Sequence, residues 1–103
     1  MKIKEGVDFK PEFVMREVLE HAEECWEAHN QELVVTSCRD GVHSAGSLHY
    51  YGLAIDFRTR YFDDVTKQKV YKEMIKRLGD KFTVVLEPTH IHIQLNLKAN
   101  QQK

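Results

Sequence analysis

The sequence has few of the features that would place it in a specialised class of protein. Its 103 residues include only two cysteines, Cys25 and Cys38, and neither belongs to a CxxC pair or another spaced metal-binding pattern. We therefore expect two reduced thiols and no disulfide. No apolar run approaches the length of a membrane-spanning helix. The formal net charge of -1 gives no electrostatic footprint for nucleic acid or for an anionic membrane.

Targeting segments and repeats are also lacking. The first residues, Met1 to Gly6, have neither the apolar core nor the small-residue cleavage site of a signal peptide. Hydrophobic residues make up 42% and charged residues 30%, which is typical of a soluble globular protein. We expect one domain over residues 1–103, with an irregular lead-in at 1–10 and a frayed tail at 98–103.

Hydrophobic periodicity predicts two helices and four strands. Apolar residues recur at helical spacing over residues 11–29, and again in a second helix that Asp63-Asp64 can cap and Gly79 can end. Short β-branched or alternating stretches predict strands over residues 33–37, 53–58, 82–86 and 90–97. This order predicts an α+β fold, a mostly antiparallel four-stranded sheet with both helices against one face.

The last predicted strand has two unlike faces. Ile91, Ile93, Leu95 and Leu97 alternate with His90, His92, Gln94 and Asn96. The aliphatic face belongs against the core, and a polar face with two histidines suits the floor of a site. The strand predicted over residues 53–58 likewise carries Asp56 on its less apolar face.

Two motifs contain the residues suited to chemistry. They are Ser47-Leu48-His49-Tyr50-Tyr51-Gly52-Leu53-Ala54-Ile55-Asp56 and Glu87-Pro88-Thr89-His90-Ile91-His92. A histidine, a carboxylate seven residues later and a distant His-x-His supply the nitrogen and oxygen ligands of a catalytic zinc with an open position. Zinc in such a site lowers the pKa of its bound water toward ~7 and polarises a carbonyl. The motifs therefore predict metal-assisted hydrolysis.

The pattern Ser47-x-His49-x-x-Gly52-x-Ala54-x-Asp56, followed by His90-x-His92, resembles that of the zinc D-Ala-D-Ala carboxypeptidase and L-Ala-D-Glu endopeptidase family. That family includes small bacteriophage endolysins and has the hedgehog/DD-peptidase fold. The resemblance runs from about Val34 to Leu95. It implies a zinc metallopeptidase, a hydrolase that cleaves amide bonds in peptidoglycan stem peptides.

The same resemblance implies particular roles. His49, Asp56 and His92 would bind one Zn²⁺, and His90 would lie beside the metal-bound water and assist catalysis. An arginine that follows a strand ahead of the first motif would bind a substrate carboxylate or a developing oxyanion, and Arg39 matches it. Ser47 would hydrogen-bond near the ligands and the substrate.

One alternative assignment fits the spacing as well. In Glu87-x-x-His90, His90 is the zinc ligand and Glu87 is the general base. We favour His92 as the ligand because the full His-x-His is present, and Glu87 is then a nearby carboxylate or a loop residue. Gln94 stands where many relatives carry an acidic residue, which bears on how the ligand histidine is oriented.

Given the net charge of -1, we expect no nucleic-acid or membrane partner, and we expect a monomer. We also expect the protein to be cytoplasmic until it is released to the cell wall, or to be virion-associated. Carboxypeptidase and endopeptidase remain alternatives, because the walls of the pocket would come from the loop at 38–48. A non-catalytic zinc-binding module of the same fold, such as a phage structural component, is the other function that the motifs allow.

Overall fold

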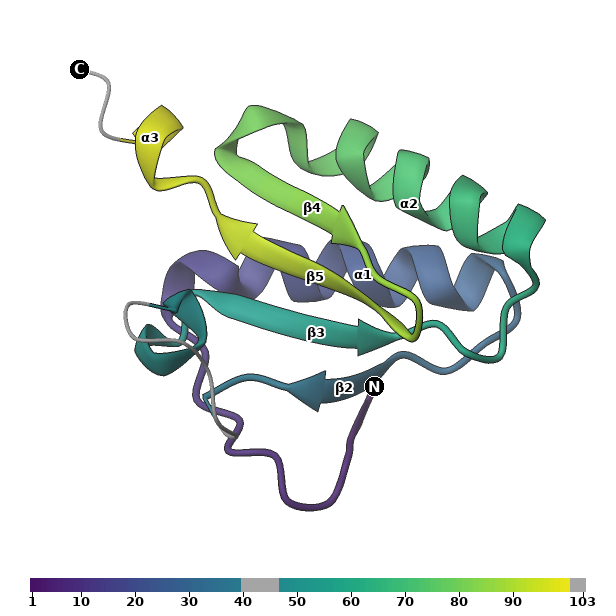
Figure 1. Ribbon diagram of the computed structural model, residues 1–103, viewed down its shortest axis with the longest axis horizontal. Coiled ribbons are helices and arrows are strands. Elements are labelled where there is room, and N and C mark those ends of the chain that lie inside the picture. The colour runs from purple at the N-terminus through teal and green to yellow at the C-terminus, as the bar shows by residue number, and fades with distance from the viewer. Residues whose placement is uncertain (40–46, 101–103) are drawn as a thin grey trace.

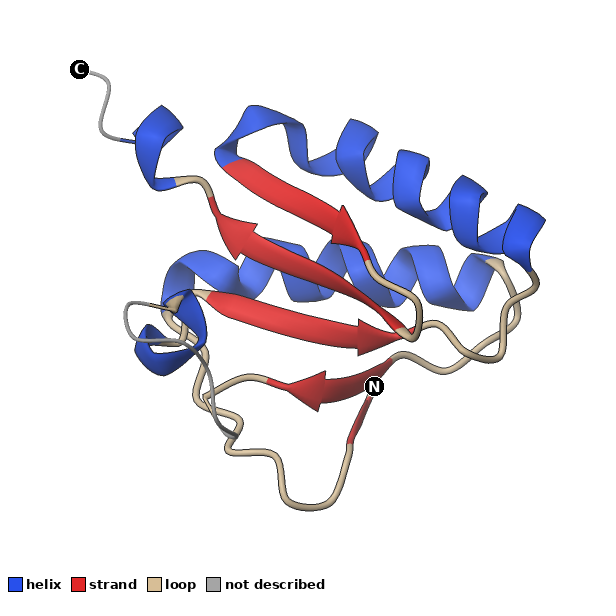
Figure 2. Ribbon diagram, in the orientation of Figure 1, coloured by secondary structure: helices blue, strands red, loops and turns tan. Residues whose placement is uncertain are grey.

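The chain forms a five-stranded sheet with two long helices against one face, as the computed structural model shows (Figures 1 and 2). The structure describes residues 1–39 and 47–100. Its helices and strands, in chain order, are β1 (Lys2–Ile3), α1 (Arg16–Ala28), β2 (Val34–Ser37), β3 (Ala54–Arg58), α2 (Asp64–Leu78), β4 (Phe82–Leu86), β5 (His90–Leu95) and α3 (Leu97–Asn100). Three short 3-10 turns, η1 (Phe13–Met15), η2 (Leu48–Tyr51) and η3 (Gly79–Lys81), complete the described elements. The predicted α+β class is confirmed.

The sheet has one strand more than the sequence predicts. Its order is β1-β2-β3-β5-β4, in which β1 pairs with β2 in parallel and the other neighbours are antiparallel. The extra strand, β1, lies in the lead-in that we expected to be irregular. Lys2 donates its backbone N–H to the carbonyl of Leu33 at 2.8 Å, and Lys4 donates to that of Val35 at 2.9 Å. A two-residue strand is too short to produce a periodic signal, so the prediction was wrong there.

The first helix begins later than predicted. The prediction started it at Pro11, but α1 starts at Arg16 after the η1 turn. The backbone N–H of Glu12 donates to the carbonyl of Gly52 at 2.9 Å, which ties this segment to η2 and keeps it out of the helix. The second helix follows its prediction closely, because the Asp63 side chain accepts from the Thr66 N–H at 2.7 Å and Gly79 forms the C-cap.

The last strand ends earlier than predicted. β5 stops at Leu95, and Leu97 begins the short helix α3. Asn96 turns the chain, since its backbone N–H donates to the carbonyl of Lys81 at 2.8 Å and its side-chain amide donates to that of Asp80 at 3.0 Å. The predicted frayed tail is therefore helical as far as residue 100, and residues 101–103 lie outside the described part.

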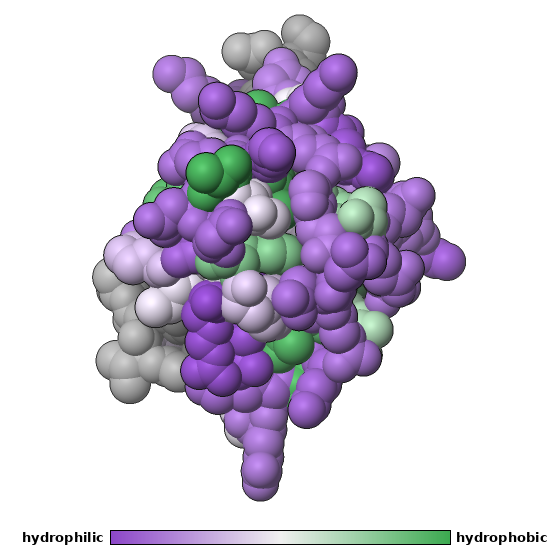
Figure 3. Space-filling model, turned by 90° about the vertical axis from the view of Figure 1, so that its right-hand side faces the viewer, coloured by the Kyte–Doolittle hydropathy of each residue, from purple (hydrophilic) through white to green (hydrophobic). Residues whose placement is uncertain are grey.

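One face of the molecule is largely polar (Figure 3). On the face shown in Figure 3, apolar side chains appear only as separate areas among hydrophilic ones. Among the residues described, no helix combines the length and the apolar character needed to cross a lipid bilayer. Most large apolar side chains lie instead between the helices and the sheet, although Phe13, Tyr51 and Val65 are exposed.

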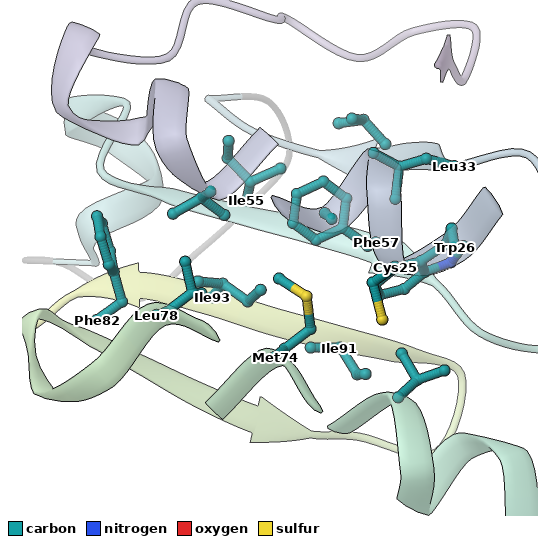
Figure 4. Close-up of a cluster of buried hydrophobic side chains, with 14 of the residues drawn as sticks. Cys25, Trp26, Leu33, Ile55, Phe57, Met74, Leu78, Phe82, Ile91 and Ile93 are labelled. Carbon is teal, nitrogen blue, oxygen red and sulfur yellow. The ribbon is translucent and has the colours of Figure 1, made fainter. Parts of the chain in front are cut away.

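The core joins both helices to the two central strands. Phe57 of β3 and Ile91 of β5 point toward Met74 of α2 and Trp26 of α1, and all four are fully buried (Figure 4). The indole N–H of Trp26 donates to the backbone carbonyl of Arg58 at 2.9 Å. This bond satisfies the polar end of a buried indole and anchors the end of β3 to the helical layer.

Gly52 allows a close approach that another residue would block. It ends η2 in the left-handed region, with φ 70° and ψ 21°. A Cβ added there would lie 2.6 Å from the carbonyl oxygen of Lys10 and 3.2 Å from the backbone nitrogen of Glu12. Glycine is required here both by the backbone conformation and by the neighbouring lead-in.

Replacing Gly52 with alanine is expected to lower the free energy of unfolding by roughly 2–4 kcal/mol, because backbone displacement adds to the cost of the left-handed conformation. Chemical denaturation measures the change. Gly6→Ala is the matched control, since Gly6 also has a positive φ of 90° but a Cβ added to it would meet nothing within 4 Å. An equal loss in both variants would contradict the role given to the close approach.

Candidate metal centre

The face of the sheet opposite the helices carries paired polar residues. In the antiparallel register of β3 and β5, Asp56 lies opposite His92 and Arg58 lies opposite His90. Alternate residues of a strand share a face. Because Ile55 and Phe57 face the core, Asp56 and Arg58 lie on the other face with the β5 histidines, as the alternation predicts.

His49 reaches this face from the η2 turn. The Ser47 hydroxyl caps that turn and accepts a hydrogen bond from the His49 backbone N–H at 3.3 Å. The His49 side chain is almost entirely buried, with a residue exposure of 4%. Its Nδ1 lies 2.8 Å from the backbone carbonyl oxygen of Cys38, which holds the ring in one orientation. Ser47 thus contacts the backbone of His49.

Three potential ligand atoms converge at one point. His92 Nδ1 lies 2.8 Å from Asp56 Oδ1, and His49 Nε2 lies 3.2 Å from His92 Nδ1 and 3.4 Å from Asp56 Oδ1. One potential ligand atom from each residue lies within 4.8 Å of the other two. These three residues could hold one metal ion, and we call them the triad.

The outer nitrogens of both histidines are bound to oxygen atoms. A carbonyl oxygen only accepts, so His49 Nδ1 donates to Cys38 and its Nε2 is left to face the triad. His92 Nε2 lies 2.8 Å from Gln94 Oε1 and donates to it, which directs Nδ1 toward Asp56. Such partners orient ligand histidines and raise their basicity. Gln94 therefore supplies the acceptor that an acidic residue would supply at this position.

The protonation states of the triad residues depend on one another. Burial by itself would raise the pKa of Asp56, but hydrogen bonds from His49 and His92 and the nearby imidazoles hold that pKa well below its usual range. The hydrogen bond to Asp56 raises the pKa of His92, and burial opposes that rise. Asp56 is therefore a carboxylate and His92 readily carries a proton on Nδ1. A metal ion would take the place of this proton.

The other predicted site residues lie around the triad. His90 is adjacent, with Nε2 at 3.7 Å from Asp56 Oδ2 and Nδ1 at 3.1 Å from the Thr89 hydroxyl. Glu87 lies in the turn between β4 and β5, where its backbone N–H donates to the His90 carbonyl at 2.9 Å. Within the described parts of the chain, no hydrogen bond or ion pair joins the Glu87 carboxylate to the triad.

Arg39 directly follows Cys38, whose carbonyl lies against His49, but among the described residues Arg39 forms no hydrogen bond or ion pair with the triad. It is exposed, and its backbone N–H donates to the Asp8 carbonyl at 3.1 Å. In residues 1–39 and 47–100, no ion pair links its guanidinium to another side chain. Most of the loop predicted to form pocket walls, residues 40–46, lies outside the described residues. The role of Arg39 remains a prediction.

A second group that could hold a metal ion was missed from the sequence. Cys25 Sγ lies 3.0 Å from Glu73 Oε2, and His29 Nε2 lies 3.4 Å from the same oxygen. The spacing of Cys25 and His29, four residues apart on one helix face, was the available signal. Burial and the hydrogen bond to Glu73 raise the pKa of the Cys25 thiol to about 12, and Arg77 pairs with Glu73 at 3.5 Å. The group serves as a polar link between α1 and α2.

Comparison with family models and with curated proteins gives no match to this sequence.

Replacing Gln94 with alanine is expected to weaken divalent-metal binding by about 10–100-fold, because the His92 ring loses the acceptor that orients it. Titration calorimetry with Zn²⁺ measures the affinity. Gln94→Glu keeps a hydrogen-bond acceptor at this position and should retain the wild-type affinity for Zn²⁺. Thr83→Ala is the control, since Thr83 is exposed and lies opposite Gln94 on β4. Wild-type affinity in Gln94→Ala would contradict the orienting role.

Proposed function

We propose that the protein is a zinc-dependent peptidase that hydrolyses amide bonds of peptidoglycan stem peptides, with the hedgehog/DD-peptidase fold. The convergence of His49, Asp56 and His92 from a turn and two strands is the observation that supports this most strongly. It agrees with the order of the two sequence motifs, which was the basis of the family resemblance.

The ligand set favours zinc among divalent ions. Two imidazole nitrogens and one carboxylate oxygen are the donors of catalytic zinc sites, which keep one position for water. Zinc bound there would supply a hydroxide near neutral pH and polarise the substrate carbonyl. The triad residues would hold the ion, and their partners Cys38 and Gln94 keep the nitrogens that would bind it directed inward.

The geometry favours His92 over His90 as the third ligand. His92 Nδ1 lies within 3.2 Å of both other ligand atoms, whereas the His90 contact to the triad is a 3.7 Å approach to Asp56 Oδ2. His90 is part-exposed beside the triad, where it can take a proton from the attacking water and return it to the leaving amine. Glu87 remains the alternative base, since its negative charge also acts on His92.

The remaining predicted residues have supporting roles. Arg39 would bind substrate from the edge of the site, where its exposed guanidinium can pair with a carboxylate or an oxyanion. Ser47 would act through His49, because its hydroxyl caps the η2 turn that carries the histidine. Carboxypeptidase and endopeptidase remain equally compatible with these residues.

Two single-histidine variants test the assignment. His92→Ala is expected to lower zinc affinity by at least about 100-fold, since losing a ligand costs more than losing an orienting partner. His90→Ala should keep zinc and lose roughly 10²–10⁴-fold in kcat, the usual contribution of a proton-transfer group. Zinc content is measured by metal analysis, and activity by release of D-alanine or stem fragments from purified cell wall.

The control is His29→Ala, which alters the Cys25–His29–Glu73 group and should leave zinc content and activity unchanged. Loss of zinc in His90→Ala together with loss of activity in Glu87→Gln would support the alternative assignment. In that assignment His90 is the zinc ligand and Glu87 is the general base. Zinc binding without hydrolysis in the wild type would identify a non-catalytic zinc-binding module. Wild-type protein that binds no zinc would refute the proposal.

A further inference from the structure

A basic pocket lies directly beside the triad. It has a volume of about 280 Å³ and is lined by Lys4, Thr36, Arg58, Arg60, Thr89 and His90. His90 connects the two sites, because it lines the pocket and its Nε2 lies 3.7 Å from Asp56 Oδ2. The His90 side chain therefore borders both the pocket and the triad.

The strands bring the positive groups of this pocket together. Arg58 ends β3 opposite His90, and Arg60 follows two residues later. Lys4 follows β1 and is held at the sheet by its backbone hydrogen bond to Val35. The backbone of Arg58 is anchored from behind by the Trp26 indole. The framework of the pocket is thus attached to the core, while its charged ends face outward.

No carboxylate of the described residues pairs with these positive charges. In residues 1–39 and 47–100, neither Lys4 nor Arg58 nor Arg60 forms an ion pair. By contrast, Arg16 pairs with Glu20 at 3.3 Å and Arg77 pairs with Glu73 at 3.5 Å. Converging cations in a hollow raise the local concentration of anions, and a guanidinium matches the geometry of a carboxylate.

We propose that this pocket binds a carboxylate of the substrate, next to the amide bond that is cleaved. This rests on the proposed peptidase function and specifies its substrate class as peptides with a free carboxylate close to the scissile bond. Arg58 and Arg60 make the main contacts, Thr36 and Thr89 complete the lining, and Arg39 is not required for these contacts.

Binding is tested first, without any need for hydrolysis. The isotope-labelled full chain is titrated with N-acetyl-D-alanine and, separately, with its amide, which lacks the negative charge. We expect the acid to shift the backbone NMR signals of Arg58, Arg60 and Thr89, and the amide to leave them unchanged. Arg58→Gln should weaken binding of the acid by about 10–100-fold, the range for a charge-assisted hydrogen bond.

Matched variants make the binding test specific. Arg16→Gln removes an arginine from α1, outside the pocket, and should bind the acid like the wild type. Arg58→Lys keeps the charge but loses the two-pronged guanidinium, so its affinity should fall between those of wild type and Arg58→Gln. Equal responses to acid and amide, or unchanged affinity in Arg58→Gln, would overturn the proposal.

Kinetics then connect the pocket to the reaction. For a peptide substrate with a free carboxylate, Arg58→Gln should lower kcat/KM about tenfold or more by raising KM. For the amidated peptide, Arg58→Gln should leave kcat/KM unchanged. Loss in Arg39→Gln alone would place the carboxylate at Arg39 and exclude this pocket. If the wild type hydrolyses nothing, the peptidase proposal fails, while the NMR titration still decides whether the pocket binds carboxylates.

Discussion

The pairing of β3 with β5 is the constraint on which the candidate site depends. It sets Asp56 opposite His92 and Arg58 opposite His90. A slip of one residue would turn each of these side chains to the other face of the sheet. The register is held by the aliphatic and aromatic residues of the same strands, because Ile55, Phe57, Ile91 and Ile93 are all fully buried on the helical side.

Apolar packing on one face therefore determines polar geometry on the other. His49 is the exception, since it comes from an irregular segment and needs its own support. That support consists of the Ser47 cap, the Cys38 carbonyl and the close approach of Gly52 to the lead-in. The triad thus combines two ligands positioned by a sheet ladder with one positioned by a turn. Damage to either part would separate the ligands.

Features with a strong local signal were predictable from the sequence. The Asp63 cap, the Gly79 end of α2 and the alternation that places Asp56 and His92 on the polar face all follow from side-chain periodicity and capping chemistry. The combination of both motifs also predicted that His49, Asp56 and His92 would meet.

Other features depend on contacts between distant segments. β1 forms only through backbone bonds to β2, and the start of α1 is displaced by the bond between Glu12 and Gly52. The acceptor for His49 is a main-chain carbonyl, which any residue at position 38 would supply. The gathering of Lys4 with Arg58 and Arg60 depends on where strands end, and the sequence carries no periodic signal for that.

The hydrogen bond from Trp26 to Arg58 has a practical consequence. Trp26 is the only tryptophan in the chain, it is fully buried, and its indole N–H is bound to the backbone at the end of β3. The emission of an indole responds to its polarity and hydrogen bonding. The protein therefore contains its own fluorescent reporter of the strand that carries Asp56 and Arg58, readable without a label in the native chain.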